Sequence, residues 1–72
     1  MTESVYKIIE LVGTSSESWE KAAAAAVETA AKSLIDLRIA EVTSLDMQLE
    51  NGKIATYRVK IKVSFKYHKE ED

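Results

Sequence analysis

The sequence predicts a small α+β domain with the element order β-α-β-β. Three observations support this prediction. A run rich in β-branched and aromatic residues at 5–12 comes first, and a helical stripe of apolar residues follows between 16 and 34. Further along, apolar residues recur at every second position, which is typical of strands. The pair Asn51-Gly52 divides this last part into strands expected at 38–50 and 53–67.

The first strand is expected to cover VYKIIELV and to end before Gly13. Val, Ile and Tyr are favoured in strands because their branched or aromatic side chains pack well on a pleated surface. Both faces of this run are largely apolar, so we expect the strand to be covered on both sides.

The helix is expected to have Ser15 or Ser16 as its N-cap, because a serine hydroxyl accepts a hydrogen bond from the free amides of the first turn. Its apolar residues follow the i, i+3, i+4, i+7 spacing of one helical face. Most of them are alanines, and helix propensity alone accounts for the run Ala22–Ala26. The full stripe is Trp19, Ala22, Ala23, Ala26, Val27, Ala30, Ala31 and Leu34.

A two-residue Asn-Gly loop fixes the register of the hairpin, because both residues take positive φ in the turn. A β-bulge would shift the pairs beyond it by one residue. Without a bulge, the expected pairs are Glu50–Lys53, Leu49–Ile54, Asp46–Tyr57, Val42–Ile61 and Glu41–Lys62.

The alternation of the last strand predicts which face of the sheet lies under the helix. Tyr57, Val59, Ile61, Val63 and Phe65 share one face, and we expect this face to pack against the helix. One helix covers only one face, yet the other face also carries an apolar strip. In the expected register this strip is Ile39, Leu45, Met47, Leu49 and Ile54. An exposed apolar strip usually marks an interface, so the sequence predicts self-association.

Length and cysteine content favour self-association as well. The 72 residues are expected to form one domain, 1–72, and a chain this short buries only about 60% of its unfolded surface when it folds alone. Small domains gain stability from disulfides, metals or oligomerisation. The sequence has no Cys and a single His, His68, so disulfides, thiolate metal sites and His-rich metal sites are excluded.

Charge and hydropathy exclude two classes of partner. The net charge is -2, which argues against nucleic-acid binding despite a basic stripe at Arg58, Lys60, Lys62 and Lys66. No apolar run approaches the ~20 residues of a membrane helix, and the polar N-terminus is unlike a signal peptide. Because the absence of Cys suits a reducing compartment, we expect a cytoplasmic protein with neither nucleic-acid nor membrane partners.

No pattern in the sequence predicts catalysis. The segment 13–16 opens a helix after a strand, where phosphates can bind, but it lacks the glycine and lysine pattern of nucleotide loops, and helix capping explains it. His68 has no partners for a catalytic triad, and we expect it to lie in a charged, frayed tail. The carboxylates are scattered along the chain. An enzymatic function would require acidic sites that are assembled between subunits. We therefore expect a non-enzymatic protein.

Considered together, these segments resemble the dodecin family. The resemblance runs from about Val5 to Phe65 and rests on the order and spacing of several short motifs. These are Val12-Gly13-Thr14-Ser15, Ser18-Trp19-Glu20, Arg38-x-x-Glu41-Val42, Tyr57-x-Val59 and Val63-x-Phe65. The resemblance implies a three-stranded antiparallel sheet curled around one helix. It also implies a hollow homododecamer that binds or stores riboflavin or FMN between its subunits, without catalysis.

The resemblance further implies a ligand site at which this chain departs from the family pattern. The flavin-stacking tryptophan corresponds to Ile39, and the glutamine that grips the ring edge corresponds to Arg58. Glu41 and Leu45 are the other candidate ligand-binding positions. Ile39 has no π-face, and Arg58 cannot accept a hydrogen bond, so we expect flavin binding to be much weakened.

This chain looks most similar to the branch of dodecins that lacks the tryptophan, some of which are described as calcium-binding. Calcium takes about six to eight oxygen ligands, and no such set can be identified in one chain. Two non-enzymatic functions therefore stay open. One is a shell that binds a small molecule or ion, flavin or calcium, at subunit interfaces, and the other is a purely structural assembly.

Overall fold

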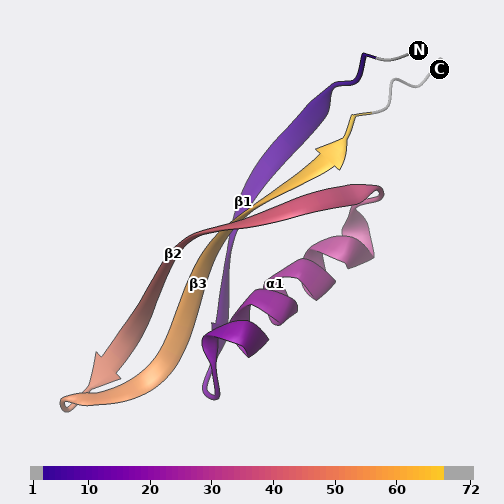
Figure 1. The fold of residues 1–72 in the computed structure, drawn as a ribbon. Coiled ribbons are helices and arrows are strands. Elements are labelled where there is room, and N and C mark those ends of the chain that lie inside the picture. The colour runs from indigo at the N-terminus through magenta and orange to yellow at the C-terminus, as the bar shows by residue number, and fades with distance from the viewer. Residues whose placement is uncertain (1–2, 68–72) are drawn as a thin grey trace.

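The computed structural model describes residues 3–67 and has the predicted β-α-β-β order (Figure 1). The elements are β1 (Tyr6–Ser15), α1 (Trp19–Ser33), β2 (Leu37–Glu50) and β3 (Lys53–Lys66). The strands form one antiparallel sheet in the order β1-β3-β2, with the helix on one side of it. The α+β fold with a three-stranded sheet is therefore confirmed. The tail expected from His68 onward lies outside the described residues.

β1 continues past Gly13 to Ser15, so the expected end of this strand at residue 12 was wrong. Gly13 is a strand residue that lies opposite Val59 and directly under the helix. A Cβ atom at this position would lie 2.1 Å from the backbone oxygen of Ala22 and 3.0 Å from the Cβ of Ala26. The glycine is needed because the helix and the strand approach each other closely here, not because a turn begins.

α1 begins at Trp19, and its N-cap is Ser18 rather than Ser15 or Ser16. The Oγ of Ser18 accepts a hydrogen bond from the backbone amide of Lys21 at 3.1 Å. The Oγ of Ser15 instead accepts bonds from the amides of Glu17 and Ser18, which stabilises the bend between β1 and α1. The predicted cap was wrong because β1 ends three residues later than expected, at Ser15 instead of residue 12, and the start of the helix moves accordingly.

Replacing Ser18 with alanine is expected to lower the free energy of unfolding by about 1 kcal/mol, because one amide of the first helical turn loses its acceptor. Ser16→Ala is the matched control, since Ser16 is exposed and its side chain makes no hydrogen bond within residues 3–67. Urea denaturation at equal protein concentration measures both variants. Equal midpoints for the two variants would contradict the assignment of Ser18 as the cap.

The core is small and lies between α1 and β3. Its buried residues are Ala22, Ala26, Ala30, Val59, Ile61 and Val63. Ile9, Leu11, Trp19, Val27 and Leu37 are partly buried around it. The alternation predicted for the last strand is thus confirmed, since Val59, Ile61 and Val63 face the helix. The alanines permit a close approach but bury little area each, so this core supplies limited stability.

The register of the hairpin agrees with the prediction at both ends and differs in the middle. Four predicted pairs are confirmed: Glu50–Lys53, Leu49–Ile54, Val42–Ile61 and Glu41–Lys62. An irregularity between Gln48 and Leu49 shifts the pairing by one residue, and another between Val42 and Ser44 restores it. Asp46 therefore lies opposite Arg58, and the predicted pair of Asp46 with Tyr57 was wrong.

The shifted register changes which residues share a face. Leu45 lies opposite Val59, and Met47 lies opposite Tyr57, so both belong to the helix side of the sheet. Leu49 follows on the same side by alternation, with Ile54 opposite it. The predicted apolar strip on the second face was therefore wrong for these four residues. We call the sheet face opposite α1 the outer face, and of the predicted strip only Ile39 lies on it.

Large apolar side chains are nevertheless exposed in two places. Beyond the start of α1, the hairpin exposes Leu45, Met47, Leu49 and Ile54 on the helix side. On the outer face, Ile8, Val12 and Ile39 are exposed, the last of them by 66%. Ile8 and Ile39 both lie opposite Ser64 and so form one row across the sheet. Exposed apolar areas of this kind on both sides of a sheet are typical of surfaces that contact other chains.

Candidate functional site

The predicted ligand positions do not converge in one chain. Ile39, Glu41 and Arg58 lie on the outer face, whereas Leu45 lies on the helix side. Ile39 is opposite Ser64, which is six residues along β3 from Arg58, so the two positions are about 20 Å apart at the usual rise of a strand. A small ligand therefore cannot touch positions 39 and 58 of the same chain, and a site that uses both would have to combine position 39 of one chain with position 58 of another.

The outer face of β3 carries three successive cations, Arg58, Lys60 and Lys62. Each has one neighbour on β1 and one on β2, because β3 is the central strand. These neighbours are Thr14 and Asp46 for Arg58, Val12 and Ser44 for Lys60, and Glu10 and Glu41 for Lys62. Lys62 thus lies between two carboxylates, although no ion pair of 4.0 Å or less joins them within residues 3–67.

Arg58 makes the best-defined polar contact on this face. Its Nε donates to Oδ1 of Asp46 at 2.8 Å, and its Nη2 donates to Oδ2 at 3.1 Å. This is the two-bond geometry in which a guanidinium recognises a carboxylate. Both side chains are about half exposed, so the pair contributes little to stability. Sequence analysis missed it because the bulges place Asp46 opposite Arg58, and the sequence shows no clear signal for them.

The hydrogen bonds from Arg58 hold the pKa of Asp46 below its ordinary value of 3.8, and the charges of Arg58 and Lys60 act in the same direction. Partial desolvation opposes them. The carboxyl group is therefore ionised and paired above its ordinary pKa. The contribution of this pair to stability is lost as the pH falls through the lowered pKa of the folded state.

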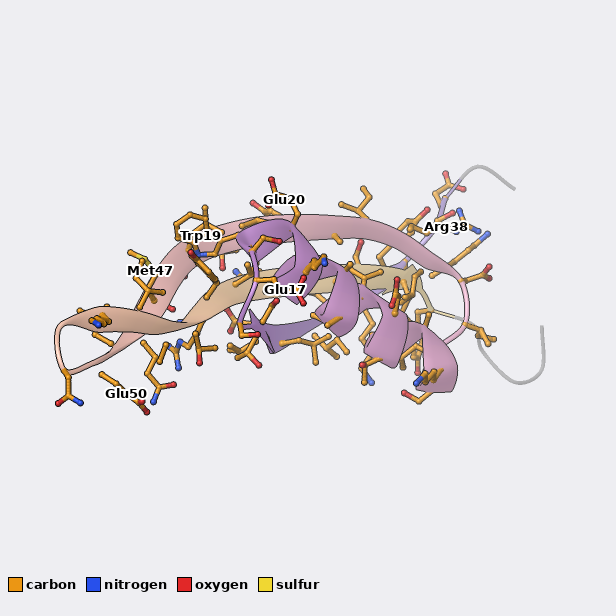
Figure 2. All side chains as sticks on the ribbon, turned by 90° about the horizontal axis from the view of Figure 1, so that it is seen from below. Glu17, Trp19, Glu20, Arg38, Met47 and Glu50 are labelled. Carbon is orange, nitrogen blue, oxygen red and sulfur yellow. The ribbon has the colours of Figure 1, made fainter. Side chains whose placement is uncertain are left out.

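Trp19, at the start of α1, contacts Asp46 of β2 from the helix side of the sheet. Its indole Nε1 donates to the backbone oxygen of Asp46 at 3.1 Å, and its ring meets Tyr57 edge to face with centroids 5.0 Å apart. Figure 2 shows Trp19 beside Met47, at the end of the helix nearest the hairpin. Asp46 is thus held from the helix side through its backbone, while its carboxylate holds Arg58 on the outer face.

The described residues of one chain form no cluster of metal-binding side chains. Within residues 3–67 no group of three or more His, Cys, Asp or Glu residues is close enough to hold a metal ion. Calcium requires about six to eight oxygen ligands, so the carboxylates described in a single subunit do not fit it. In the same described part, no helix is long and apolar enough to cross a membrane.

The fold and the outer-face positions define a class of protein, a one-helix subunit with a three-stranded sheet in the dodecin arrangement. The dodecin family model matches residues 5–68. The chain belongs to the dodecin family. This confirms the resemblance found in the sequence.

Two solved structures and one curated relative extend this comparison. The calcium dodecin of Mycobacterium tuberculosis is 51% identical over 63 residues, which cover 88% of this chain and 89% of the relative. A crystal structure of calcium dodecin from the same organism, described as having a novel calcium-binding site, has a TM-score of 0.81 and 49% identity, and covers 90% of this chain and 93% of its own. The structure of dodecin from Streptomyces coelicolor has a TM-score of 0.90 and is 33% identical. The match covers 96% of this chain and 99% of the Streptomyces chain.

Proposed function

We propose that this protein is a non-enzymatic, calcium-binding homododecamer of the cytoplasm, with its calcium sites formed between subunits. The observation that carries the proposal is the 51% identity, over 88% of the chain, to a protein described as calcium dodecin. The identity spans all four elements, so the similarity is not confined to a single motif.

The exposed apolar surface supports the assembly. Within residues 3–67 six hydrophobic residues are buried in the core, whereas Ile39, Leu45, Met47, Leu49 and Ile54 are all at least 42% exposed. A further groove of about 420 Å³ lies between β1 and α1 and is lined largely by apolar side chains, among them Ile9, Leu11, Ala26 and Leu34. Covering these areas in an assembly stabilises a subunit whose own core is small.

The placement of the carboxylates supports sites between subunits. Glu10, Glu41 and Asp46 lie along the two edge strands of the outer face, Glu17 lies just before α1, and Glu20 lies in its first turn. All are exposed, and within the described residues they form no metal cluster in one chain. We therefore expect a calcium ion with the usual number of oxygen ligands to take groups from more than one subunit.

Calorimetric titration of the chelator-treated assembly with Ca²⁺ tests this proposal. We expect saturable binding and a rise of the melting temperature with calcium concentration, because a ligand that binds only the native assembly stabilises it. Mg²⁺ is the control ion, since it prefers a smaller and more rigid octahedral shell. An unchanged melting temperature at millimolar Ca²⁺, together with the absence of binding heat, would exclude calcium and favour a purely structural assembly.

Flavin is the second candidate ligand, because it is what the dodecin resemblance implies for the outer face. Positions 39 and 58 both lie on that face, as a site shared between subunits requires. Ile39 lacks the π-face on which a flavin stacks, and the donors of Arg58 are partly taken by Asp46. We therefore expect the wild-type protein to quench riboflavin fluorescence weakly or not at all.

A further inference from the structure

The geometry of Arg58 points to a use of the outer face that the calcium and flavin proposals do not include. Asp46 takes only the Nε and Nη2 edge of the guanidinium. An arginine has further N–H donors on Nη1 and Nη2. Within residues 3–67 no hydrogen bond engages these remaining donors. Because the side chain is 45% exposed, they are open to an external acceptor.

The pairing with Asp46 orients the guanidinium before any ligand arrives. A free arginine side chain loses rotamer freedom when it binds, and a side chain already held by two hydrogen bonds loses less. Asp46 is itself held, because its backbone oxygen accepts the indole bond of Trp19. The remaining donors therefore point away from the carboxylate in a defined direction.

The surroundings favour an anion over a neutral acceptor. Lys60 follows Arg58 on the outer face of β3. Its positive charge also acts on Asp46 and helps to lower the pKa of that carboxyl group. Lys62 continues the stripe of positive charge. Thr14 and Ser44 stand opposite Arg58 and Lys60, so each cation has a hydroxyl group as a cross-strand neighbour. Guanidinium, ammonium and hydroxyl donors together suit the oxygens of a phosphate group.

We infer that Arg58, oriented by Asp46 and accompanied by Lys60, forms an anion site on the outer face that takes the phosphate group of a small soluble ligand. This inference rests on the proposal above only in treating the outer face as a ligand-binding surface. It needs neither calcium nor flavin stacking. Asp46 is a positioning residue in this site, and Arg58 and Lys60 are the residues that contact the ligand.

Titration calorimetry with inorganic pyrophosphate, at low ionic strength and with chelator present, tests the inference. Low salt is needed because exposed charges are screened at higher ionic strength. We expect Arg58→Gln to bind pyrophosphate roughly tenfold more weakly than the wild type, since charge-assisted hydrogen bonds are lost. Arg38→Gln is the matched control with the same change of charge. Arg38 lies at the opposite end of β2 beside Asp36, and we expect its replacement to leave the affinity unchanged.

Lys60→Gln keeps the test decisive if Arg58→Gln disturbs the fold or the assembly. Lys60 makes no ion pair within residues 3–67, so its replacement leaves the Arg58–Asp46 pair intact. We expect a severalfold loss of pyrophosphate affinity, with Lys32→Gln on the helix as the unaffected control. The inference is overturned if the wild type does not bind millimolar pyrophosphate, or if Lys60→Gln binds it as tightly as the wild type. Because calcium is chelated throughout, failure of the calcium proposal does not affect either outcome.

Discussion

Replacing Gly13 with alanine is expected to prevent the native packing of α1 on the sheet. The added Cβ would lie 2.1 Å from the backbone oxygen of Ala22, far inside van der Waals contact. Because the clash is with backbone, no side-chain rotation relieves it, and the whole helix must move away from β1. Overpacking of a core typically costs about 1–3 kcal/mol, and we expect the upper end or more here.

Circular dichroism during urea denaturation measures this loss, together with the mass of the assembly in the absence of denaturant. Glu10→Ala is the control, since Glu10 lies on β1 but is exposed on the outer face, where substitutions usually change stability by less than about 0.5 kcal/mol. A Gly13→Ala protein with the stability and mass of the wild type would show that the helix does not approach β1 as closely as described.

The double substitution Ile39→Trp with Arg58→Gln is expected to strengthen flavin binding well beyond that of the wild-type protein, in which we expect weak binding or none. Tryptophan supplies the missing stacking surface, which contributes roughly 1–3 kcal/mol per stacked ring by analogy with base stacking. Glutamine supplies both a donor and an acceptor for the edge of the flavin ring, whereas arginine only donates. Both substitutions lie on the outer face, and neither removes a buried contact.

Quenching of riboflavin fluorescence on titration with protein measures the gain. The matched control is Ile8→Trp with Arg38→Gln, which adds the same aromatic side chain to the outer face and removes the same charge. Ile8 lies in the same row as Ile39, on the other side of Ser64. Equal quenching by the two double variants, or none by either, would contradict the assignment of positions 39 and 58 to the ligand site.

The elements of the fold could be predicted because their signals are local. The alternation of Val59, Ile61 and Val63 is a direct consequence of one buried face, and Asn51-Gly52 takes the positive φ values of the expected turn. The helical stripe identified the buried alanines. The start of the helix was less certain, because Ser15, Ser16 and Ser18 are equivalent as caps in sequence and only the length of β1 selects Ser18.

The faces taken by residues 45–49 of β2 and by Ile54 could not be predicted, because they depend on irregularities that have no clear sequence signal. A single extra residue moves Leu45 and Met47 from the outer face to the helix side and brings Asp46 opposite Arg58. The expectation that apolar residues are left uncovered was nevertheless correct. All members of the predicted strip are exposed, namely Ile39, Leu45, Met47, Leu49 and Ile54. The site depends on the same irregularities, and so the Arg58–Asp46 pair became visible only in the structure.

The mass of the purified protein tests the central claim of self-association most directly. Light scattering coupled to size exclusion, in calcium-containing and chelator-containing buffers, gives this mass without reference to shape. We predict a single species with the mass of a dodecamer of 8.0 kDa chains at micromolar concentration. A folded and stable monomer under the same conditions would contradict the claim, because the exposed residues of the hairpin and the outer face would then need no partner.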